Sequence, residues 1–406
     1  MHILFVSHFY PPEELSMAFL IKELADYMAA RGHSVDVLTG FPNWPSGNCF
    51  PGYRADAFTR TAEGKVTVHR MPFLASPNGP IWKRLLDFKS FERAIGKYGR
   101  TLDRPDMIYV HVPPNEDAIA ALRLARQFAC KVVVNVQDIQ PDSTIDLGYI
   151  KNGMIIKLLR MQEQKMYRHA SHITVIGESF RQRLLSKGIA RERISIIPNW
   201  IDARAVAPVD RETPLRAEWG IAPSRFVVLY AGTFGRVHGT NVLLETAKAL
   251  SNRDDILFLF VGQGYDFQRN RDLAAEWRLK NVQFRNFVPR SRLSELQSTS
   301  DVSLVTLRKG FGHTSVPSKV LGYMAAGRGV IGLVDDHCDT ARLINAAGCG
   351  CVLEPENPAP LAEELARISH DRRVAAQWGG NARKYILDHL DAPVVLDQAA
   401  KLLESL

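Results

Sequence analysis

Apolar runs and helical segments alternate along the first half of the chain. Continuous apolar runs such as "HILFVS" and "SVDVLTG" flank "SMAFLIKELADYMAARGH", in which apolar residues recur at helical spacing. Similar runs follow at "DMIYVHVPP", "KVVVNVQD" and "HITVIGES". Strands of a parallel sheet are apolar on both faces because helices cover them. The pattern therefore predicts an α/β fold with a doubly wound parallel sheet.

A second series of the same kind occupies most of the remaining chain. It opens at "FVVLYAGTFGR" and continues through "ILFLFVGQG", "VQFRNFVP", "DVSLVTL" and "GVIGLVD". The polar, proline-containing stretch "NWIDARAVAPVDRETPLRAEWG" separates the two series. We expect two Rossmann-like domains, residues 1–201 and 202–377, with C-terminal helices in residues 378–406 crossing back to the first. Ligands of such sheets bind at the carboxyl ends of the strands, so we expect a cleft between the two domains.

Composition agrees with this organisation and limits the partners. The chain has 406 residues, of which 46% are hydrophobic and 23% charged, as in ordinary globular proteins. A formal net charge of +8 indicates an anionic partner: nucleic acid, an acidic membrane surface or a phosphorylated small molecule. The five cysteines lack paired metal spacing, and no Asp-x-Asp or P-loop motif occurs, so we expect no metal. The short N-terminal apolar run ends in two prolines, which predicts a cytoplasmic protein without a signal peptide.

Two segments of the second series are candidates for binding phosphate. In "AGTFGRVHG", Gly232 and Gly235 allow the backbone to approach a ligand, and Arg236 has a geometry that suits phosphate oxygens. In "TSVPSKVLGYMAAG", Lys319 falls in the first turn of a predicted helix, where the positive end of the helix dipole disfavours a cation unless an anion binds. The alternatives are a plain strand-to-helix turn and a lysine at the surface. Together, the two segments favour a bound diphosphate.

The first domain offers polar residues at the ends of two predicted strands. Gln137 and Asp138 end "VVVNVQD", where Asp138 either contacts a sugar hydroxyl, acts as a base or caps a turn. "SHFYPPEELS" follows the first strand and places Pro12, Glu13 and Glu14 where an acceptor could bind. Solvation of both glutamates is the alternative.

Residues 79–99 form a predicted amphipathic helix rich in cations. Trp82 lies near its start, and the segment contains several lysines and arginines but only two acidic residues. The cations that we expect at a membrane are Lys83, Arg84, Lys89 and Arg93. Such a helix is typical of binding to an anionic membrane surface. The alternative is a helix packed on its own domain with a solvated basic face. The clustering of cations in one helix disfavours nucleic-acid binding.

Taken together, these motifs resemble the family 4 glycosyltransferases of the GT-B fold. Within that family the chain is similar to the WbuB-like branch, which builds bacterial surface polysaccharides. The resemblance runs along nearly the whole chain and is carried by "FYPPE", "GFPNWPSG", "NVQDIQPDS", "ITVIGESFRQRLLSKGI", "LYAGTFGRVHG", "FLFVGQG" and "SVPSK". "GFPNWPSG" and "NVQDIQPDS" are the motifs most specific to the branch.

The resemblance implies metal-independent, retaining transfer of a sugar from a nucleotide diphosphate donor, without a cofactor. It implies catalytic roles for Gln137, Asp138, Arg236 and Lys319. It also implies a UDP-linked donor, for example of N-acetyl-fucosamine or a related amino sugar, and a polyprenyl-diphosphate-linked acceptor at the inner face of the cytoplasmic membrane, for O-antigen, capsule or exopolysaccharide assembly. The donor-binding positions are Gly232, Phe234, Gly235, His238, Gly262, Val288, Ser315, Val316 and Ser318.

The chain departs from the family pattern at three positions. Relatives usually carry two glutamates eight residues apart where this chain has Thr314 and Gly322, and a lysine where it has His238. Lys319 is then expected to supply the missing cation. Two other functions remain open at this point: a nucleotide-sugar epimerase, and a degenerate glycosyltransferase that serves as a non-catalytic assembly subunit.

Overall fold

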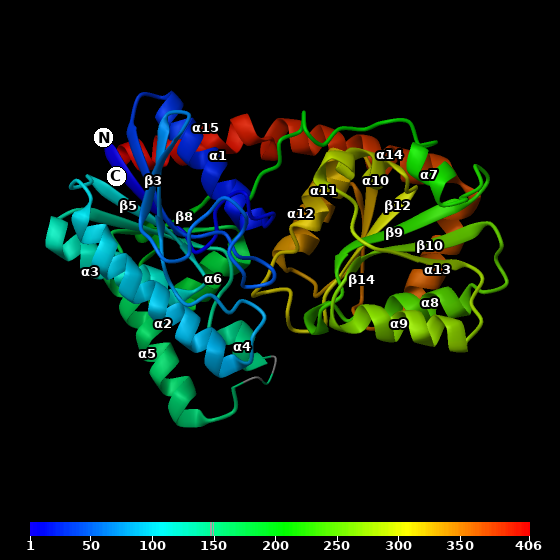
Figure 1. The fold of residues 1–406 in the computed structure, drawn as a ribbon. Coiled ribbons are helices and arrows are strands. Elements are labelled where there is room, and N and C mark those ends of the chain that lie inside the picture. The colour runs from blue at the N-terminus through cyan, green and yellow to red at the C-terminus, as the bar shows by residue number, and fades with distance from the viewer. Residues whose placement is uncertain (147, 149) are drawn as a thin grey trace. The chain divides into compact units, whose positions relative to one another are not determined.

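The computed structural model describes residues 1–146, 148 and 150–406. The chain forms two compact units, one containing Met1–Asn199 and Val395–Leu406 and the other Trp200–Val394. Each unit consists of one sheet with helices packed against it (Figure 1). The α/β class predicted from the apolar runs is confirmed in both units.

The first unit contains an eight-stranded sheet with the order β3-β4-β2-β1-β5-β6-β7-β8. Neighbouring strands are parallel except β3, which pairs antiparallel with β4. The apolar strands β1, β5 and β6 are almost entirely buried, as expected for a sheet covered on both faces. The strands are β1 (His2–Val6), β2 (Ser34–Gly40), β3 (Thr59–Glu63), β4 (Val66–Met71), β5 (Met107–Val112), β6 (Lys131–Val136), β7 (His172–Val175) and β8 (Ile194–Ile196).

Helices of the first unit follow most of these strands. The last helix of the chain, α15 (Ala392–Ser405), reaches this unit at its C-terminal end, where Glu404 forms a 2.7 Å ion pair with Arg31 at the end of α1. The other helices are α1 (Ser16–Ala30), α2 (Ile81–Tyr98), α3 (Asn115–Phe128), α4 (Asp142–Asp146), α5 (Gly153–His169) and α6 (Glu178–Ser186).

The second unit contains a six-stranded, fully parallel sheet with the order β11-β10-β9-β12-β13-β14. Its core is built from the apolar side chains of β9, β10 and the helices that cover them. The strands are β9 (Phe226–Thr233), β10 (Ile256–Gln263), β11 (Val282–Arg285), β12 (Val302–Thr306), β13 (Gly329–Leu333) and β14 (Gly350–Leu353). The helices are α7 (Pro214–Glu218), α8 (Asn241–Ala249), α9 (Tyr265–Glu276), α10 (Leu293–Ser298), α11 (Lys319–Ala325), α12 (Asp339–Ala347), α13 (Pro358–His370) and α14 (Arg372–Tyr385), followed by a π-helical turn at Ile386–Leu390.

The observed division of the chain differs from the expected one near the C-terminus. The first unit ends at Asn199, close to the expected residue 201, but the expected second boundary at residue 377 falls inside α14. That helix remains in the second unit because it packs on β13 and α11, with Ala375, Gly379 and Ala382 buried. Only the segment from Val395 onward groups with the first unit.

Candidate active site

Two glycines at the ends of β9 and β10 bring the two following loops together. Gly232 and Gly262 are paired across the strands, and both have positive φ. A Cβ atom on Gly262 would lie 1.9 Å from the carbonyl oxygen of Gly232, so only glycine fits there. The N–H of Phe234 donates to the carbonyl of Gln263, and the carbonyl of Phe234 accepts from the N–H of Asp266. The loops therefore form one continuous backbone surface at the carboxyl edge of the sheet.

Phe234 contributes only its backbone to this surface. Its side chain is fully buried and packs against the rings of Tyr230 and Phe267 in the core. Donor binding by Phe234 therefore stays a prediction for its backbone, because the side chain faces the core. Phe234 directly follows the core strand β9, and the burial of its ring anchors the loop.

Lys319 is the first residue of α11, and its ammonium is directed at the end of β9. The side chain is half-buried, but its Nζ atom is buried and has no hydrogen-bond partner among the described residues. Nζ lies 3.8 Å from the centroid of the Tyr230 ring, and a Cβ on Gly232 would be 3.0 Å from it. Burial lowers the pKa of Lys319 to about 7. A buried cation without an anionic partner is costly unless a ligand provides the anion.

The position of α11 is fixed by Tyr323. Its buried hydroxyl accepts from the N–H of Ala231 at 2.8 Å and donates to the carbonyl of the same residue at 3.1 Å. Ser318 occupies the N-cap position but makes no side-chain cap bond. Ser315 and Val316 are half-buried in the segment that leads into the helix, and Ser318 is exposed.

His238 stands close to the same ammonium and is neutral. The backbone N–H of His238 donates to the carbonyl of Gly235, which precedes the short turn η3 (Arg236–His238). A Cβ on Gly235 would lie 3.2 Å from Nδ1 of the His238 ring. Burial, followed by the charge of Lys319, lowers the pKa of His238 to about 3. The structure therefore brings together Gly232, Gly235, His238 and Lys319, with a single buried cation among them.

Arg236 is exposed and stacks on an aromatic ring that sequence reasoning missed. Its guanidinium carbon lies 4.2 Å from the ring centroid of Tyr265, the first residue of α9. Tyr265 is 67% exposed, so the ring covers the guanidinium at the surface. The aromatic residue directly after "GQG" was the signal in the sequence.

The loop before α11 is braced by Asp335, which was also missed. Its carboxylate accepts from the N–H groups of Gly310 and Gly312 at 2.8 to 3.0 Å. Thr314 is buried, and its hydroxyl donates to a backbone carbonyl within the loop. Gly322 packs beside the amide of Gln297, so no carboxylate occupies either position where relatives carry glutamate.

Val288 follows β11, the next strand of the same sheet edge. It is half-buried, and the neighbouring Phe287 is 48% exposed. Since the carboxyl ends of parallel strands lie along one edge of a sheet, this loop continues the surface formed after β9 and β10.

In the first unit, Gln137 is held from both ends of its side-chain amide. Its Nε2 donates to Oδ1 of Asn135, and its Oε1 accepts from Nδ2 of Asn199. Asn135 continues the chain of bonds to the hydroxyl of Thr174. These bonds fix the orientation of the Gln137 amide at the end of β6, and its expected catalytic role stays a prediction. Asp138, the next residue, is half-buried at the end of β6.

Glu13 corrects another expectation. Its side chain is 1% exposed and accepts hydrogen bonds from the N–H groups of Tyr10, Asn43 and Trp44. Burial raises the pKa of this carboxyl. Glu13 therefore joins the "FYPPE" and "GFPNWPSG" loops and is not directed at an acceptor, whereas its neighbours Pro12 and Glu14 are exposed.

The expected membrane residues all lie on the outer face of α2. Trp82 is 57% exposed, and the four cations are also exposed: Lys83, Arg84, Lys89 and Arg93. The two acidic residues of the helix are buried: Asp87 contacts His8, and Glu92 pairs with Lys89 and Arg123. The outward-facing charge of this helix is therefore positive.

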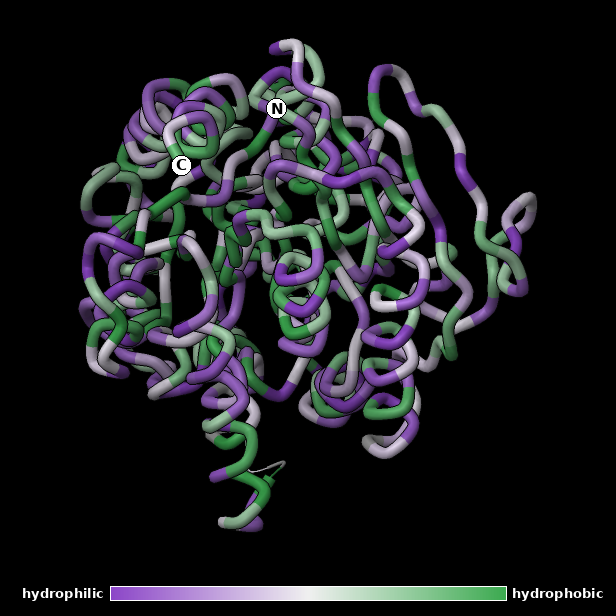
Figure 2. The backbone as a smooth tube through the Cα atoms, turned by 90° about the vertical axis from the view of Figure 1, so that its left-hand side faces the viewer, coloured by the Kyte–Doolittle hydropathy of each residue, from purple (hydrophilic) through white to green (hydrophobic). Residues whose placement is uncertain are grey.

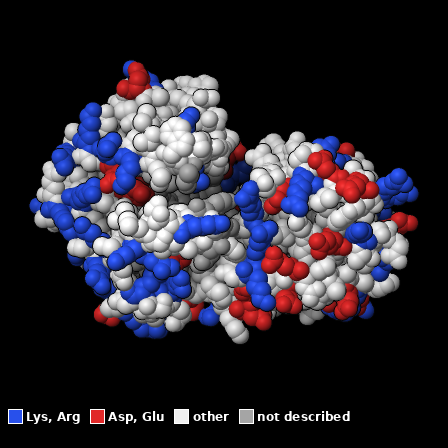
Figure 3. Space-filling model, turned by 90° about the horizontal axis from the view of Figure 1, so that it is seen from below, with Lys and Arg blue, Asp and Glu red and all other residues white. Residues whose placement is uncertain are grey.

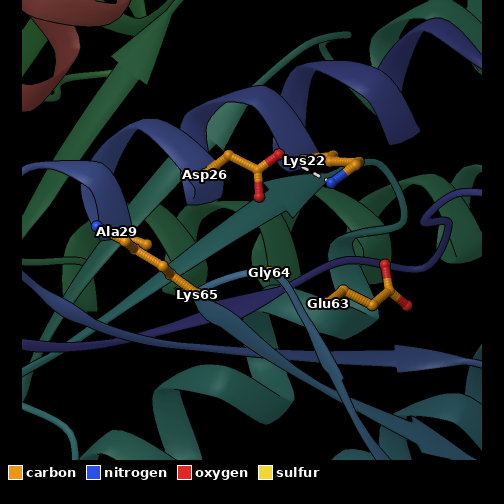
Figure 4. Close-up of a pocket in the computed structure, with 6 residues that line it drawn as sticks. All are labelled: Lys22, Asp26, Ala29, Glu63, Gly64 and Lys65. Atoms are coloured by element: carbon orange, nitrogen blue, oxygen red, sulfur yellow. Dashed lines mark hydrogen bonds and ion pairs between the residues drawn. The ribbon is translucent and has the colours of Figure 1, made fainter.

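A recess in the first unit lies apart from every predicted site residue (Figure 4). It is lined by α1 and the turn between β3 and β4, through Lys22, Asp26, Ala29, Glu63, Gly64 and Lys65. Nζ of Lys22 lies 2.8 Å from Oδ2 of Asp26, so this cation already has a carboxylate partner. We assign the recess no part in the site.

Comparisons with known proteins agree with this geometry. Residues 17–200 match the glycosyl transferase 4-like domain, and residues 211–385 match the glycosyl transferases group 1. WcaI of Escherichia coli (strain K12), described as a colanic acid biosynthesis glycosyl transferase, is 27% identical over 400 residues, which cover 96% of each chain.

Solved structures show the same fold at lower identity. Sucrose-phosphate synthase of Thermosynechococcus elongatus superposes with a TM-score of 0.79 at 17% identity and covers 100% of this chain and 98% of that one. Anabaena HepE in complex with UDP-glucose gives a TM-score of 0.70 at 16% identity, with full coverage of both chains. These matches identify a glycosyltransferase and so argue against the alternative of a nucleotide-sugar epimerase. The chain belongs to the glycosyltransferases of the GT-B fold, with a glycosyl transferase 4-like first half and a group 1 second half.

Proposed function

We propose that this glycosyltransferase moves a sugar, with retention of configuration, from a nucleotide diphosphate donor to a lipid-linked glycan in bacterial surface polysaccharide assembly, as in the WbuB-like branch. The observation that carries the proposal is the buried ammonium of Lys319, which has no anionic partner among the described residues and lies against Gly232. HepE was solved with UDP-glucose, and WcaI is described as acting in colanic acid biosynthesis, which supports both parts of the proposal. The donor sugar that we propose is a UDP-linked N-acetyl-fucosamine or a related amino sugar.

In this proposal the donor diphosphate binds beside Gly235 and Lys319 and the backbone of residues 315–318, with Arg236 at its exposed side. Positive charge fixed at that place stabilises the diphosphate as it leaves, and no metal is required for this. The bond between the anomeric carbon and the phosphate oxygen breaks, and the acceptor hydroxyl oxygen bonds to the same face of the sugar. Its proton passes to the departing phosphate oxygen. Asp138 holds the donor sugar, and Gln137 fixes the strand end from which Asp138 projects.

Replacing Lys319 with methionine tests the proposal, because methionine keeps the buried apolar stem and removes the charge. Charge-assisted hydrogen bonds contribute about 1.5 to 3 kcal/mol, so the dissociation constant for UDP-glucose should rise roughly ten- to 150-fold in calorimetry. The free protein should unfold at the same or a higher temperature, because an unpaired buried charge is gone. Lys309→Met, at an exposed lysine of the same unit, is the control. Unchanged affinity in Lys319→Met would refute the proposed donor site.

The absence of carboxylates at Thr314 and Gly322 favours one second candidate, a non-catalytic assembly subunit. Such a protein would bind nucleotide through Lys319 without turning it over. Release of UDP from a UDP-sugar in the presence of a polyprenyl-diphosphate-linked acceptor separates the two. Release that needs the acceptor supports the transferase, and its absence with intact donor binding supports the subunit.

We also propose that the protein acts at the inner face of the cytoplasmic membrane, where a lipid-linked acceptor would be located. No helix within the described part of the chain is long and apolar enough to cross a bilayer. The outer face of α2, with exposed Trp82 and four exposed cations, supports binding to an anionic surface.

A further inference from the structure

The first half of α5 exposes most of its apolar side chains. Met154 is 82% exposed, Ile155 49%, Leu158 64% and Met161 60%. The second half of the helix packs on the protein, since Met166 and Tyr167 are buried. Figure 2 shows the early turns of α5 projecting below the neighbouring tubes of the first unit, with many residues coloured as hydrophobic. Four large apolar side chains on one projecting helix end indicate a surface that something else covers.

The exposed apolar residues form a stripe. At 100° per residue, Met154, Ile155, Leu158 and Met161 fall within about 120° of the helix circumference, the width of the apolar face of an amphipathic helix. The body side of the same turns carries Ile156 and Leu159, both half-buried.

The exposed charges on this part of α5 have one sign, although Arg160 also lies 3.9 Å from the buried carboxylate of Asp142. Residues 151–162 include no acidic residue, and Lys151, Lys157 and Arg160 are exposed. Further along, Lys165 and Arg168 line a groove together with Lys157, Arg160 and Met161. In Figure 3, Lys and Arg atoms gather over the left-hand part of the molecule, which is the first unit. The surface is therefore complementary to a negatively charged partner.

The basic helices lie in sequence on one face of the first unit. α2 contacts α3, and α3 contacts α5. The first turns of α2 carry their own exposed apolar residues, Trp82, Leu85 and Leu86, each at least half exposed. Figure 1 shows α2 and α5 beginning in the lower part of this unit. The first turns of α2 and of α5 therefore both expose apolar and basic side chains.

We propose that the first half of α5 inserts into the boundary between headgroups and acyl chains of an anionic bilayer. The inference deepens the proposed function and rests on it, because a lipid-linked acceptor requires the enzyme to reach a membrane. Residues 153–162 rise about 15 Å along the helix axis, enough to enter the 5 to 10 Å deep interfacial layer and too short to span the bilayer. A projecting apolar stripe flanked by cations matches an anionic bilayer, where negatively charged headgroups lie next to an apolar layer.

Vesicle flotation of the full-length protein tests the inference. The variant Met154→Gln/Leu158→Gln/Met161→Gln replaces the three most exposed apolar residues of the stripe with a residue of good helix propensity. Wild-type protein should float with vesicles of phosphatidylcholine containing 30% phosphatidylglycerol, and the variant should bind them at least tenfold more weakly at the same salt concentration. The control is Val209→Gln/Leu387→Gln, which changes two apolar residues of the second unit that are 43% and 45% exposed and should float like wild type.

Three outcomes would overturn the insertion of α5. The first is flotation of the triple variant to the same extent as wild type, and the second is wild-type flotation that does not depend on phosphatidylglycerol. The third is binding only to vesicles that contain other membrane proteins, which would indicate a protein partner. Circular dichroism and the dissociation constant for UDP-glucose verify that the triple variant is folded.

The proposed sugar transfer and the proposed membrane insertion can be tested independently. Transfer to a soluble, short-chain prenyl-diphosphate acceptor without vesicles should be unchanged in the triple variant. If wild type shows no such transfer but floats as expected, the proposed function falls and the membrane contact of α5 remains.

Discussion

At the residue scale, the buried ammonium of Lys319 should couple donor binding to pH. In the free protein burial lowers its pKa to about 7, so at pH 8 most molecules carry a neutral amine. A bound diphosphate favours the charged form, so binding above pH 7 should take up close to one proton and weaken about tenfold for each unit of pH. Calorimetry of UDP-glucose binding in buffers of different ionisation enthalpy measures that proton. The uptake should vanish in Lys319→Met, and equal affinity at pH 7 and pH 9 in the wild type would contradict the coupling.

Asp138 should matter for turnover and not for nucleotide binding. In Asp138→Asn we expect at least a hundredfold slower transfer, the usual scale for a group placed at the reacting centre, with an unchanged dissociation constant for UDP. Asp142→Asn is the contrast, because Asp142 is buried and pairs with Arg183 and Lys187 at 2.7 and 2.9 Å. That variant should lower the unfolding temperature. A wild-type transfer rate in Asp138→Asn would reduce Asp138 to a turn residue.

Some site residues could be predicted from the sequence and others could not. Lys319 was predictable because a cation in the first turn of a helix conflicts with the helix dipole, and the glycines because they directly follow a strand. The burial of Glu13 was not, since it depends on N–H groups about thirty residues away in another loop. The bonds of Gln137 likewise depend on Asn199, which comes from a distant strand end.

At the element scale, a buried ion cluster connects α2 and α3 to the loop after β1. His8 follows β1, and its ring nitrogens lie 3.2 Å from Oδ1 of Asp87 on α2 and 3.6 Å from Oδ2 of Asp117 on α3. All three side chains are almost fully buried. Burial alone would lower the pKa of His8, but the nearby carboxylates of Asp117 and Asp87 outweigh it and raise the pKa to about 9.

This cluster should make the first unit less stable at alkaline pH. Unfolded histidine titrates near pH 6.5, so between about 6.5 and 9 the native state holds the extra proton and its stability falls as the pH rises. The loss should be on the order of 3 kcal/mol. Asp117→Asn should lower the pKa of His8 and flatten this slope in thermal unfolding followed from pH 6 to pH 10. Lys319 contributes a slope of the opposite sign in both proteins, so the difference between them is decisive; equal slopes would refute the assignment.

Most strands and helices could be predicted because their apolar residues face a core. The β3–β4 hairpin and α5 are examples that could not. The β3–β4 hairpin has an edge strand whose residues are mostly polar and at least partly exposed, so it carries no apolar run. Residues 153–169 were assigned no element, although they form α5; its apolar residues are divided between a packed half and an exposed half, which obscures a single buried face.

At the scale of the whole molecule, the candidate donor site and the candidate membrane surface lie in different units. The candidate donor site belongs to the second unit, whereas the basic faces of α2 and α5 belong to the first. Membrane binding and donor binding should therefore respond to different substitutions. This separation allows each to be tested with the other as its internal control.

Replacing Lys83, Arg84, Lys89 and Arg93 with glutamine should release the protein from anionic vesicles. Each cation near such a surface contributes about 1 kcal/mol at low salt, and Lys89 contributes less because it pairs with Glu92. The affinity for vesicles containing phosphatidylglycerol should fall at least tenfold and up to about a thousandfold, and salt should weaken wild-type binding in the same direction.

The matched control neutralises four exposed cations of the second unit, Arg269, Arg271, Lys280 and Arg373, and changes the net charge equally. If vesicle binding follows net charge alone, both variants lose it to the same extent, and the specific role of α2 is refuted. If α2 is the contact, only the first variant leaves the membrane, while both bind UDP-glucose like wild type. Transfer to an acceptor embedded in vesicles should then fall with membrane affinity, and transfer to a soluble acceptor should not.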